Sequence, residues 1–304
     1  MLELDRVSKT YTIGTLGGTE LRAVRDVSFA IDRGEVISLI GESGSGKSTI
    51  GRMLLRLLRV SGGAIRLDDV DISGLKRGDL KRYYSNVQGV FQDPFSSYNP
   101  IFKVDRVFWM LYDEYATDTN RDEWREKVAA ALAAVGLDAR HVLGKYPHQL
   151  SGGQLQRLLV ARALLLEIDY LVADEITSML DASTRIDVLN LLGDLRSRGL
   201  GVLFITHDLS LGNYISDRTI ILRHGAIVEM GDTHMVYGNP QHPYTQMLLT
   251  SVPRLHHKWR RDRPAEETAV SREAPRSADA PPLVEVEKGH LVARNVAEGK
   301  SLAT

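Results

Sequence analysis

Two glycine-rich segments of the sequence have the residue types of anion-binding turns. The first, GESGSGKST at residues 41–49, follows the apolar run VISLI and precedes a helical pattern. In that context the glycines let backbone N–H groups approach the phosphates of a nucleotide, the lysine adds a charge at the β- and γ-phosphates, and the serine offers a hydroxyl to Mg²⁺. The residues predicted to bind the nucleotide are Gly41, Ser43, Gly44, Ser45, Gly46, Lys47, Ser48 and Thr49.

The second glycine-rich segment, LSGGQLQR, lies at residues 150–157 and also opens onto a helical pattern. Bare backbone N–H groups at a helix start attract anions. Ser151 is also an ordinary residue type for a helix N-cap. Because one nucleotide needs only one phosphate cradle, this turn is either local structure or serves a nucleotide that is bound elsewhere.

An acidic pair, Asp174 and Glu175, ends the apolar run YLVADE. Successive residues of a strand point in opposite directions, so the two carboxylates are expected to have different tasks. We expect Asp174 to hold Mg²⁺ together with Ser48. We expect Glu175 to polarise the water that attacks the γ-phosphate.

Two further polar residues follow apolar strand patterns: Gln92 comes after GVF, and His207 comes after VLFIT. Ligands of α/β proteins bind at the carboxyl ends of the strands, where both side chains are expected to emerge. Gln92 is predicted to bind Mg²⁺ or to hold a water, and His207 to donate a hydrogen bond to the γ-phosphate. Both residues therefore join the catalytic set with Glu175.

The order of the predicted elements indicates an α/β fold. N-terminal strand patterns come first, and strands over residues 169–175 and 201–208 alternate with helical patterns, which favours parallel strands covered by helices. A helix is predicted over residues 47–60. Residues 100–165 are strongly helical and are predicted to form an insertion within the α/β domain.

The composition shifts after about residue 255. Residues 260–282 are charged, with scattered Pro, Ala and Ser, which is typical of a linker or flexible tail. The segment PLVEVEKGHLVA, residues 282–293, is predicted to add one or two short strands that dock back onto the domain.

The composition of the whole chain limits the possible classes of protein. Of 304 residues, 43% are hydrophobic and 25% charged, which is ordinary for a globular protein. The net charge of −1 gives no bulk attraction to nucleic acid. There is no cysteine, so a disulfide or an iron–sulfur cluster cannot form. The N-terminal residues lack a signal-peptide pattern, and no apolar run reaches the roughly 20 residues of a membrane span, so we expect a chain that is soluble or that binds a membrane through a partner.

The segments GESGSGKST, FQDP, LSGGQLQR, LVADE, SMLD and FITHD stand in the order and spacing of ATP-binding cassette (ABC) ATPases, which the sequence resembles over about residues 1–250. The resemblance implies a P-loop NTPase core, in which helices flank a mixed sheet. It also implies an N-terminal antiparallel β region and an inserted α-helical signature subdomain. Ile176 and Met179 depart from the family's usual proline and alanine, but neither removes a catalytic group, so an active ATPase is expected.

The resemblance also gives the second glycine-rich segment a purpose. In this family two cassettes pack head to tail, and the segment faces the γ-phosphate of the ATP on the other subunit. The residues implied to reach that partner ATP are Ser151, Gly152, Gly153, Gln154 and Asp181. Tyr11 lies where the family has an aromatic side chain that stacks on adenine.

The segment NPQHPYTQMLLTSVP, residues 239–253, is similar to the C-terminal motif of the oligopeptide/dipeptide importer subfamily, and residues 251–304 would then be its C-terminal extension. The resemblance implies a second ABC ATPase subunit in a heterodimer, two membrane permease subunits and an extracytoplasmic substrate-binding protein. It places the chain peripherally on the cytoplasmic face of the membrane. Many relatives bind an iron–sulfur centre through cysteines that this chain lacks. Peptides are the expected cargo, with oligosaccharides as an open alternative.

Two alternatives stay open from the sequence. Part of the aromatic-rich stretch 91–110, which includes Phe95 and Tyr98, forms either a groove for a helix of the membrane subunit or the core of the helical subdomain. The competing function is a soluble ABC ATPase that acts on nucleic acid or ribosomes. The chain has a single cassette, no sustained heptads and no basic excess, which disfavours that function.

Overall fold

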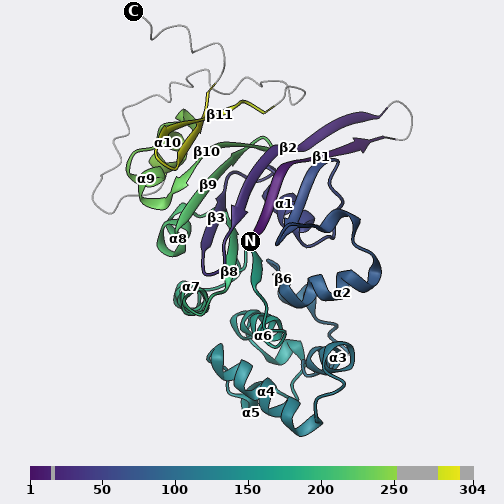
Figure 1. Cartoon of the computed structure of the whole chain (residues 1–304). Coiled ribbons are helices and arrows are strands. Elements are labelled where there is room, and N and C mark those ends of the chain that lie inside the picture. Colours follow the sequence, from purple (N-terminus) through teal and green to yellow (C-terminus); the bar gives the residue numbers. More distant parts are fainter. Residues whose placement is uncertain (15–17, 252–279, 295–304) are drawn as a thin grey trace, which may run out of the picture.

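The computed structural model describes residues 1–14, 18–251 and 280–294, which form two sheets and their covering helices (Figure 1). The smaller sheet is antiparallel, with the strand order β2-β1-β4-β5. Its strands are β1 (Leu2–Ile13), β2 (Thr19–Ile31), β4 (Gly62–Leu67) and β5 (Val70–Asp71). The predicted N-terminal antiparallel β region is therefore confirmed.

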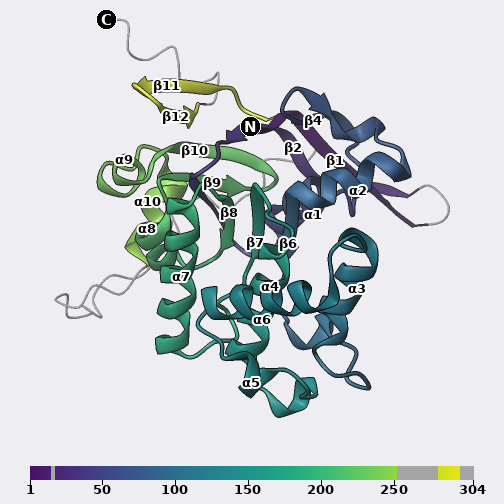
Figure 2. The ribbon, with the colours of Figure 1, turned by 60° about the horizontal axis from the view of Figure 1, so that its bottom comes forward.

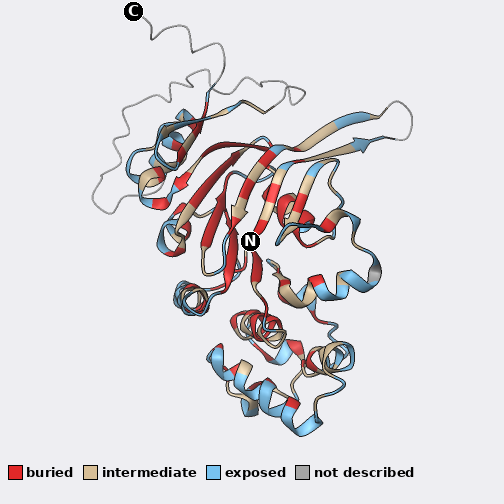
Figure 3. Ribbon diagram, in the orientation of Figure 1, coloured by how far each residue is buried: buried red, intermediate tan, exposed pale blue. Residues whose placement is uncertain are grey.

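The larger sheet is mixed and has the strand order β11-β12-β10-β9-β3-β8-β7-β6. The parallel strands are β3 (Val36–Ile40), β6 (Val87–Val90), β7 (Tyr170–Asp174), β8 (Gly201–Thr206) and β9 (Arg218–Arg223). The strands β10 (Ala226–Asp232), β11 (Leu283–Glu287) and β12 (His290–Ala293) are antiparallel. Figure 3 shows β3, β7 and β8 buried throughout, as their continuous apolar runs require.

The helices that flank the two sheets are α1 (Lys47–Leu54), α2 (Arg77–Asn86), α7 (Ala182–Ser197), α8 (Leu209–Ile215), α9 (Thr233–Gly238) and α10 (Pro243–Thr250). The prediction of one helix over residues 47–60 was wrong in length. Helix α1 ends at Leu54, and Arg56 has a positive φ of 54°, which an α-helix cannot contain. No helix was predicted for α2 or α10.

The inserted helical subdomain lies at the bottom of Figure 1, below the larger sheet, and Figure 2 shows its helices from another side. It contains α3 (Arg106–Tyr115), α4 (Arg121–Ala134), α5 (Ala139–Val142) and α6 (Gly152–Leu164). Its buried side chains include Phe108, Trp124 and Leu155, which belong to a cluster that continues into the larger sheet. The continuous core fixes α6 relative to the strands.

The C-terminal segment returns to the domain as predicted. Strands β11 and β12 form a hairpin, and β12 pairs with β10 at the edge of the larger sheet. The predicted linker at residues 260–282 lies almost wholly outside the described residues. Within residues 1–14, 18–251 and 280–294, no helix is both long and apolar enough to cross a bilayer.

Candidate nucleotide site

The phosphate-binding loop connects strand β3 to helix α1, so its backbone N–H groups lie at the start of a helix. Gly44 and Gly46 have positive φ angles of 78° and 108°, which side-chain-bearing residues rarely adopt. A Cβ atom on Gly46 would also lie 2.5 Å from the carbonyl oxygen of Ala23 on β2. Position 46 therefore requires glycine, because of its backbone φ angle and its close contact with the smaller sheet.

Lys47 lies folded into the loop, with its side chain 6% exposed. Its Nζ donates hydrogen bonds to the carbonyl oxygens of Gly41 at 2.6 Å and Glu42 at 2.9 Å. Burial lowers the pKa of Lys47, while the nearby carboxylates of Glu175 and Asp174 raise it. The ammonium group therefore lies where it can face both the loop and the acidic pair. The buried Oγ of Ser45 finds no hydrogen-bond partner among the described residues.

The loop forms one wall of a hollow of about 550 Å³. The other walls bring side chains from four separate parts of the chain to the same place, at the carboxyl ends of the parallel strands. The residues that line it are Ala23, Ser43, Gly44, Gly46, Lys47, Ser48, Thr49, Gln92, Glu175 and His207. Most of the predicted nucleotide and catalytic residues thus share one hollow. Gly41 and Ser45 belong to the loop but do not line it.

The two carboxylates of the acidic pair have different contacts, although Glu175 lies beyond the end of β7 and strand alternation does not apply to it. The carboxylate of Asp174 ends β7 and accepts a 3.1 Å hydrogen bond from the hydroxyl of Ser48. Burial raises the pKa of Asp174, and the bond from Ser48 opposes that rise. Ser48 and Gln92 line the hollow and Asp174 lies behind Ser48; a hydroxyl, an amide oxygen and a carboxylate are the hard oxygen ligands that Mg²⁺ binds.

Glu175 begins the turn after β7 with a φ of 55°, and its backbone N–H donates to the carbonyl oxygen of Ile205. This strained turn points the carboxylate toward His207, whose Nδ1 lies 2.7 Å and 2.9 Å from the two carboxylate oxygens. The His207 side chain is 63% exposed and the Glu175 side chain 15%. The histidine therefore contacts the expected base in this structure, and its Nε2 is left for another partner.

The second glycine-rich turn does not line the hollow. Ser151 is the N-cap of α6 and forms a capping box with Gln154, at 3.2 Å and 2.9 Å. Gly153 packs against α7, since a Cβ atom there would lie 2.4 Å from the Thr184 methyl carbon. Asp181 caps α7 through the backbone N–H of Thr184, and hydroxyl and backbone donors lower its pKa strongly. Ser151, Gly153 and Asp181 thus have structural roles within this chain, and none of them lines the hollow of the phosphate loop.

Comparisons with known proteins agree with this geometry. Residues 24–178 match the ABC transporter family, and residues 228–277 match the C-terminal region of oligopeptide/dipeptide transporters. The chain is 36% identical to the oligopeptide transport ATP-binding protein OppF of Bacillus subtilis, covering 100% of this chain and 99% of that protein. It is 41% identical to the oligopeptide transport ATP-binding protein AmiF of Streptococcus pneumoniae, covering 93% and 92%.

The chain belongs to the ABC transporter family. The solved structure of a dimeric ATP-binding cassette, bound to ADP and Pi in a post-hydrolysis state, matches it with a TM-score of 0.69 and 30% identity, covering 77% of this chain and 99% of that one. Family and fold together make this chain an ATP hydrolase of the ABC type, and they confirm the predicted fold class.

Two residues of this ABC ATPase qualify the sequence predictions. Tyr11 lies on β1 opposite Leu21, beside the Nζ of Lys9, and does not line the hollow. Ala23 does line it, and no sequence signal pointed to this residue, because its contact with the loop runs through a backbone carbonyl. A short side chain at Ala23 leaves room for the nucleotide.

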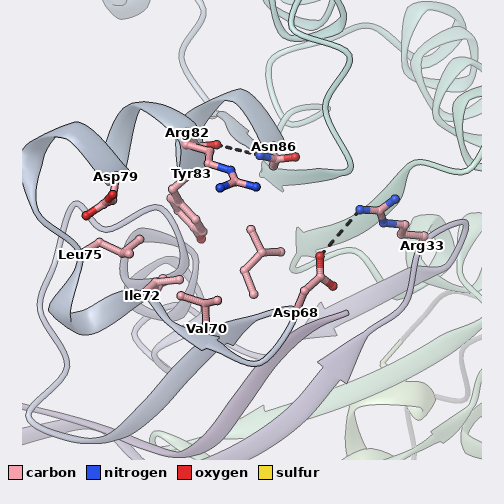
Figure 4. Close-up of a pocket in the computed structure, with 10 residues that line it drawn as sticks. Arg33, Asp68, Val70, Ile72, Leu75, Asp79, Arg82, Tyr83 and Asn86 are labelled. Atoms are coloured by element: carbon pink, nitrogen blue, oxygen red, sulfur yellow. Dashed lines mark hydrogen bonds and ion pairs between the residues drawn. The ribbon is translucent and has the colours of Figure 1, made fainter.

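A further hollow of about 480 Å³ lies between the smaller sheet and α2 and contains none of the predicted site residues (Figure 4). Its floor is apolar and includes Ile72 and Tyr83. The Arg33 guanidinium on its rim lies 3.8 Å from Asp68 and 2.6 Å from Asp169. The lining contains two cations, Arg33 and Arg82, and two carboxylates, Asp68 and Asp79, so this hollow of the ABC ATPase lacks the positive charge surplus of a phosphate site.

Proposed function

We propose that this chain is the ATP-hydrolysing subunit that powers peptide import by a membrane ABC transporter. The observation that carries the proposal is the single hollow in which the phosphate loop meets Gln92, Glu175 and His207. The match of residues 228–277 to the oligopeptide/dipeptide transporter C-terminal region supports peptides as the cargo, as do the names of the relatives.

Each residue of the site has a distinct proposed task. The loop from Gly41 to Thr49 binds the phosphates through backbone N–H groups, and Lys47 adds a positive charge beside them. Ser48, Asp174 and Gln92 would hold Mg²⁺, which neutralises phosphate charge when bound. Glu175 accepts a proton from the attacking water.

His207 orients the base. Its contact with both oxygens of Glu175 fixes the carboxylate at the edge of the hollow before any water arrives. With Nδ1 facing Glu175, its Nε2 donates to the γ-phosphate when that nitrogen carries a proton. The pair thus links the position of the base to the presence of the nucleotide.

The second glycine-rich turn is proposed to serve the ATP of a partner cassette. The capped helix start of α6 has the backbone donors that bind an anion, and it lies outside this chain's own hollow. The residues proposed to act across that interface are Ser151, Gly152, Gly153, Gln154 and Asp181. Tyr11 is proposed to stack on adenine from the smaller sheet.

The proposed assembly is a heterodimer of ABC ATPase subunits beneath two membrane permease subunits, on the cytoplasmic face of the membrane, supplied by an extracytoplasmic substrate-binding protein. Phe95, Ile101 and Phe102 have exposed apolar side chains, with exposed fractions of 47%, 76% and 38%, and are proposed to contact a permease helix. Tyr98 and Phe108 are buried, so the burial of Tyr98 contradicts its expected place in the groove beside Phe95. These two side chains belong to the core of the helical subdomain.

The experiment that tests the proposal is ATP-dependent uptake of a labelled oligopeptide by the complete transporter in vesicles. Glu175→Gln keeps the shape of the base and removes its proton affinity, so uptake and ATP hydrolysis should both fall about 10²- to 10⁴-fold, while ATP binding stays intact. The exposed Glu126 on α4 provides the matched control, Glu126→Gln, which should change neither rate. Hydrolysis that is lost without any effect on peptide uptake would contradict the proposed coupling.

A further inference from the structure

The C-terminal helix α10 touches the phosphate-binding loop. The hydroxyl of Tyr244 accepts a 3.2 Å hydrogen bond from the backbone N–H of Glu42. The Tyr244 side chain is 1% exposed and packs in a cluster with Ile40, the last residue of β3. The guanidinium carbon of Arg223 lies 4.8 Å from the ring centroid. Tyr244 is therefore buried between this cluster and Arg223, and its hydroxyl is an acceptor for the loop.

The residue that Tyr244 contacts is central to the loop. The carbonyl oxygen of Glu42 accepts hydrogen bonds from the Nζ of Lys47 at 2.9 Å and from the backbone N–H of Ser45 at 3.2 Å. Glu42 thus links the two residues: its N–H is held by the Tyr244 hydroxyl, and its C=O holds the ammonium group of Lys47. A shift of Glu42 would move the rest position of Lys47.

The start of α10 is fixed in turn by a buried carboxylate. Glu229 on β10 is 0% exposed, and its two oxygens accept the backbone N–H groups of Gln241 at 2.8 Å and His242 at 2.9 Å. A buried carboxylate without partners would cost several kcal/mol. The two bonds therefore tie the N-cap of α10, and with it Tyr244, to strand β10 of the larger sheet.

The C-terminal hairpin closes the network. His290 on β12 is 1% exposed, and its Nε2 donates to Glu229 Oε1 at 2.8 Å. Strand β12 pairs with β10 at the same place, where Val292 lies opposite Glu229. Ala293 packs in the cluster that contains Tyr244 and Ile40. The hairpin thus reaches the phosphate loop both through polar contacts and through the apolar cluster.

We propose that Tyr244 is a positioning residue for the phosphate-binding loop, and that the C-terminal hairpin fixes Tyr244 through His290 and Glu229. The inference rests on the proposed binding of ATP by the loop. Without the Tyr244 hydroxyl the N–H of Glu42 loses its protein acceptor, and the loop gains freedom that nucleotide binding must remove. The hairpin then contributes to nucleotide affinity, although it lines no part of the hollow.

The first test compares the full-length chain with its Tyr244→Phe variant, which keeps the ring and removes only the hydroxyl. The Kd for Mg-ATP should rise about three- to tenfold, the usual worth of one such hydrogen bond. Tyr112→Phe is the matched control, because it removes a hydroxyl that donates to Thr119 in the helical subdomain at 2.9 Å. Its Kd should stay within about twofold of wild type. Equal Kd values for the two variants would overturn the role of Tyr244.

The second test addresses the hairpin. His290→Leu removes the donor, and His290→Gln keeps an N–H near the place of Nε2. His290→Leu, like Tyr244→Phe, should raise the Kd for Mg-ATP, and His290→Gln should recover part of the lost affinity. In the double variant with Tyr244→Phe, the two fold-changes should combine to less than their product, because both act on one contact. A full product, or no effect of His290→Leu, would overturn the role of the hairpin.

The binding assay also separates this inference from the proposed function. Lys47→Ala removes the charge beside the phosphates and should weaken Mg-ATP binding far more than Tyr244→Phe. If wild type and Lys47→Ala bind ATP equally, the loop is no nucleotide site and both proposals fail. If Lys47→Ala loses binding and Tyr244→Phe matches its control, only the positioning role is wrong.

Discussion

Gly152 offers the sharpest test of whether the second glycine-rich turn serves a partner's ATP. It is the first residue of α6, after the Ser151 cap, and a Cβ atom there would meet only a ring carbon of Phe95, at 3.9 Å. Gly152→Asp therefore fits within its own subunit. Gly153→Asp does not, since its Cβ would lie 2.4 Å from the Thr184 methyl carbon. A loss of ATPase activity in Gly153→Asp could therefore come from this local clash as well as from an effect on the partner's ATP.

Gly152→Asp is expected to stabilise the isolated subunit and to impair ATP-driven closure of the assembled complex. Replacing glycine within a helix, and placing an acid in its first turn, should together raise the free energy of unfolding by about 0.5–1.5 kcal/mol. Across the interface, a carboxylate about 4 Å from one phosphate charge costs about 4 kcal/mol at an effective dielectric constant of 20. That corresponds to about three orders of magnitude in ATP-driven closure.

The assay compares Gly152→Asp with Gly152→Asn, which has nearly the same shape and no charge. Both variants should bind Mg-ATP as isolated subunits with the wild-type Kd, because Gly152 does not line the hollow. In the assembled transporter, the ATPase rate of the site that faces α6 should fall at least about 10²-fold further for Asp than for Asn. Equal turnover of the Asp and Asn variants would refute the placement of α6 against a partner's phosphate.

Two further predictions follow from the site and the surface. Because burial raises the pKa of Asp174, its ionised form destabilises the nucleotide-free fold. Asp174→Asn should therefore raise the free energy of unfolding at pH 8, and it should abolish Mg-dependent hydrolysis. The gain in the free energy of unfolding should shrink as the pH falls through the pKa of Asp174, and urea unfolding at several pH values measures it. Phe95→Ala should weaken assembly with the membrane subunits while ATP affinity and stability stay unchanged, and copurification together with ATP binding checks both. A Phe95→Ala variant that assembles fully would remove this side chain from the permease contact.

The buried strands and the phosphate loop could be predicted because their signals are local. The apolar run before GESGSGKST gives a strand, and the glycines at Gly44 and Gly46 give the turn, whose positive φ angles the structure contains. The last strands, at residues 283–293, were predicted from an equally local pattern. The early end of α1 was missed, because its apolar periodicity continues past Arg56, where the backbone turns left-handed.

The sequence by itself determined which residue types stand at the carboxyl ends of strands, and hence the candidate phosphate, metal and water-activating groups. Only the tertiary structure decided which aromatic side chains are exposed, since Phe95 is exposed and Tyr98 is buried although they share one segment. It also decided that Thr184 leaves no room for a side chain at position 153, while position 152 has room for one. Tyr244 and Glu42 are 202 residues apart, and no local pattern predicts that contact. Such contacts depend on how separate elements pack, and that packing is a property of the whole chain.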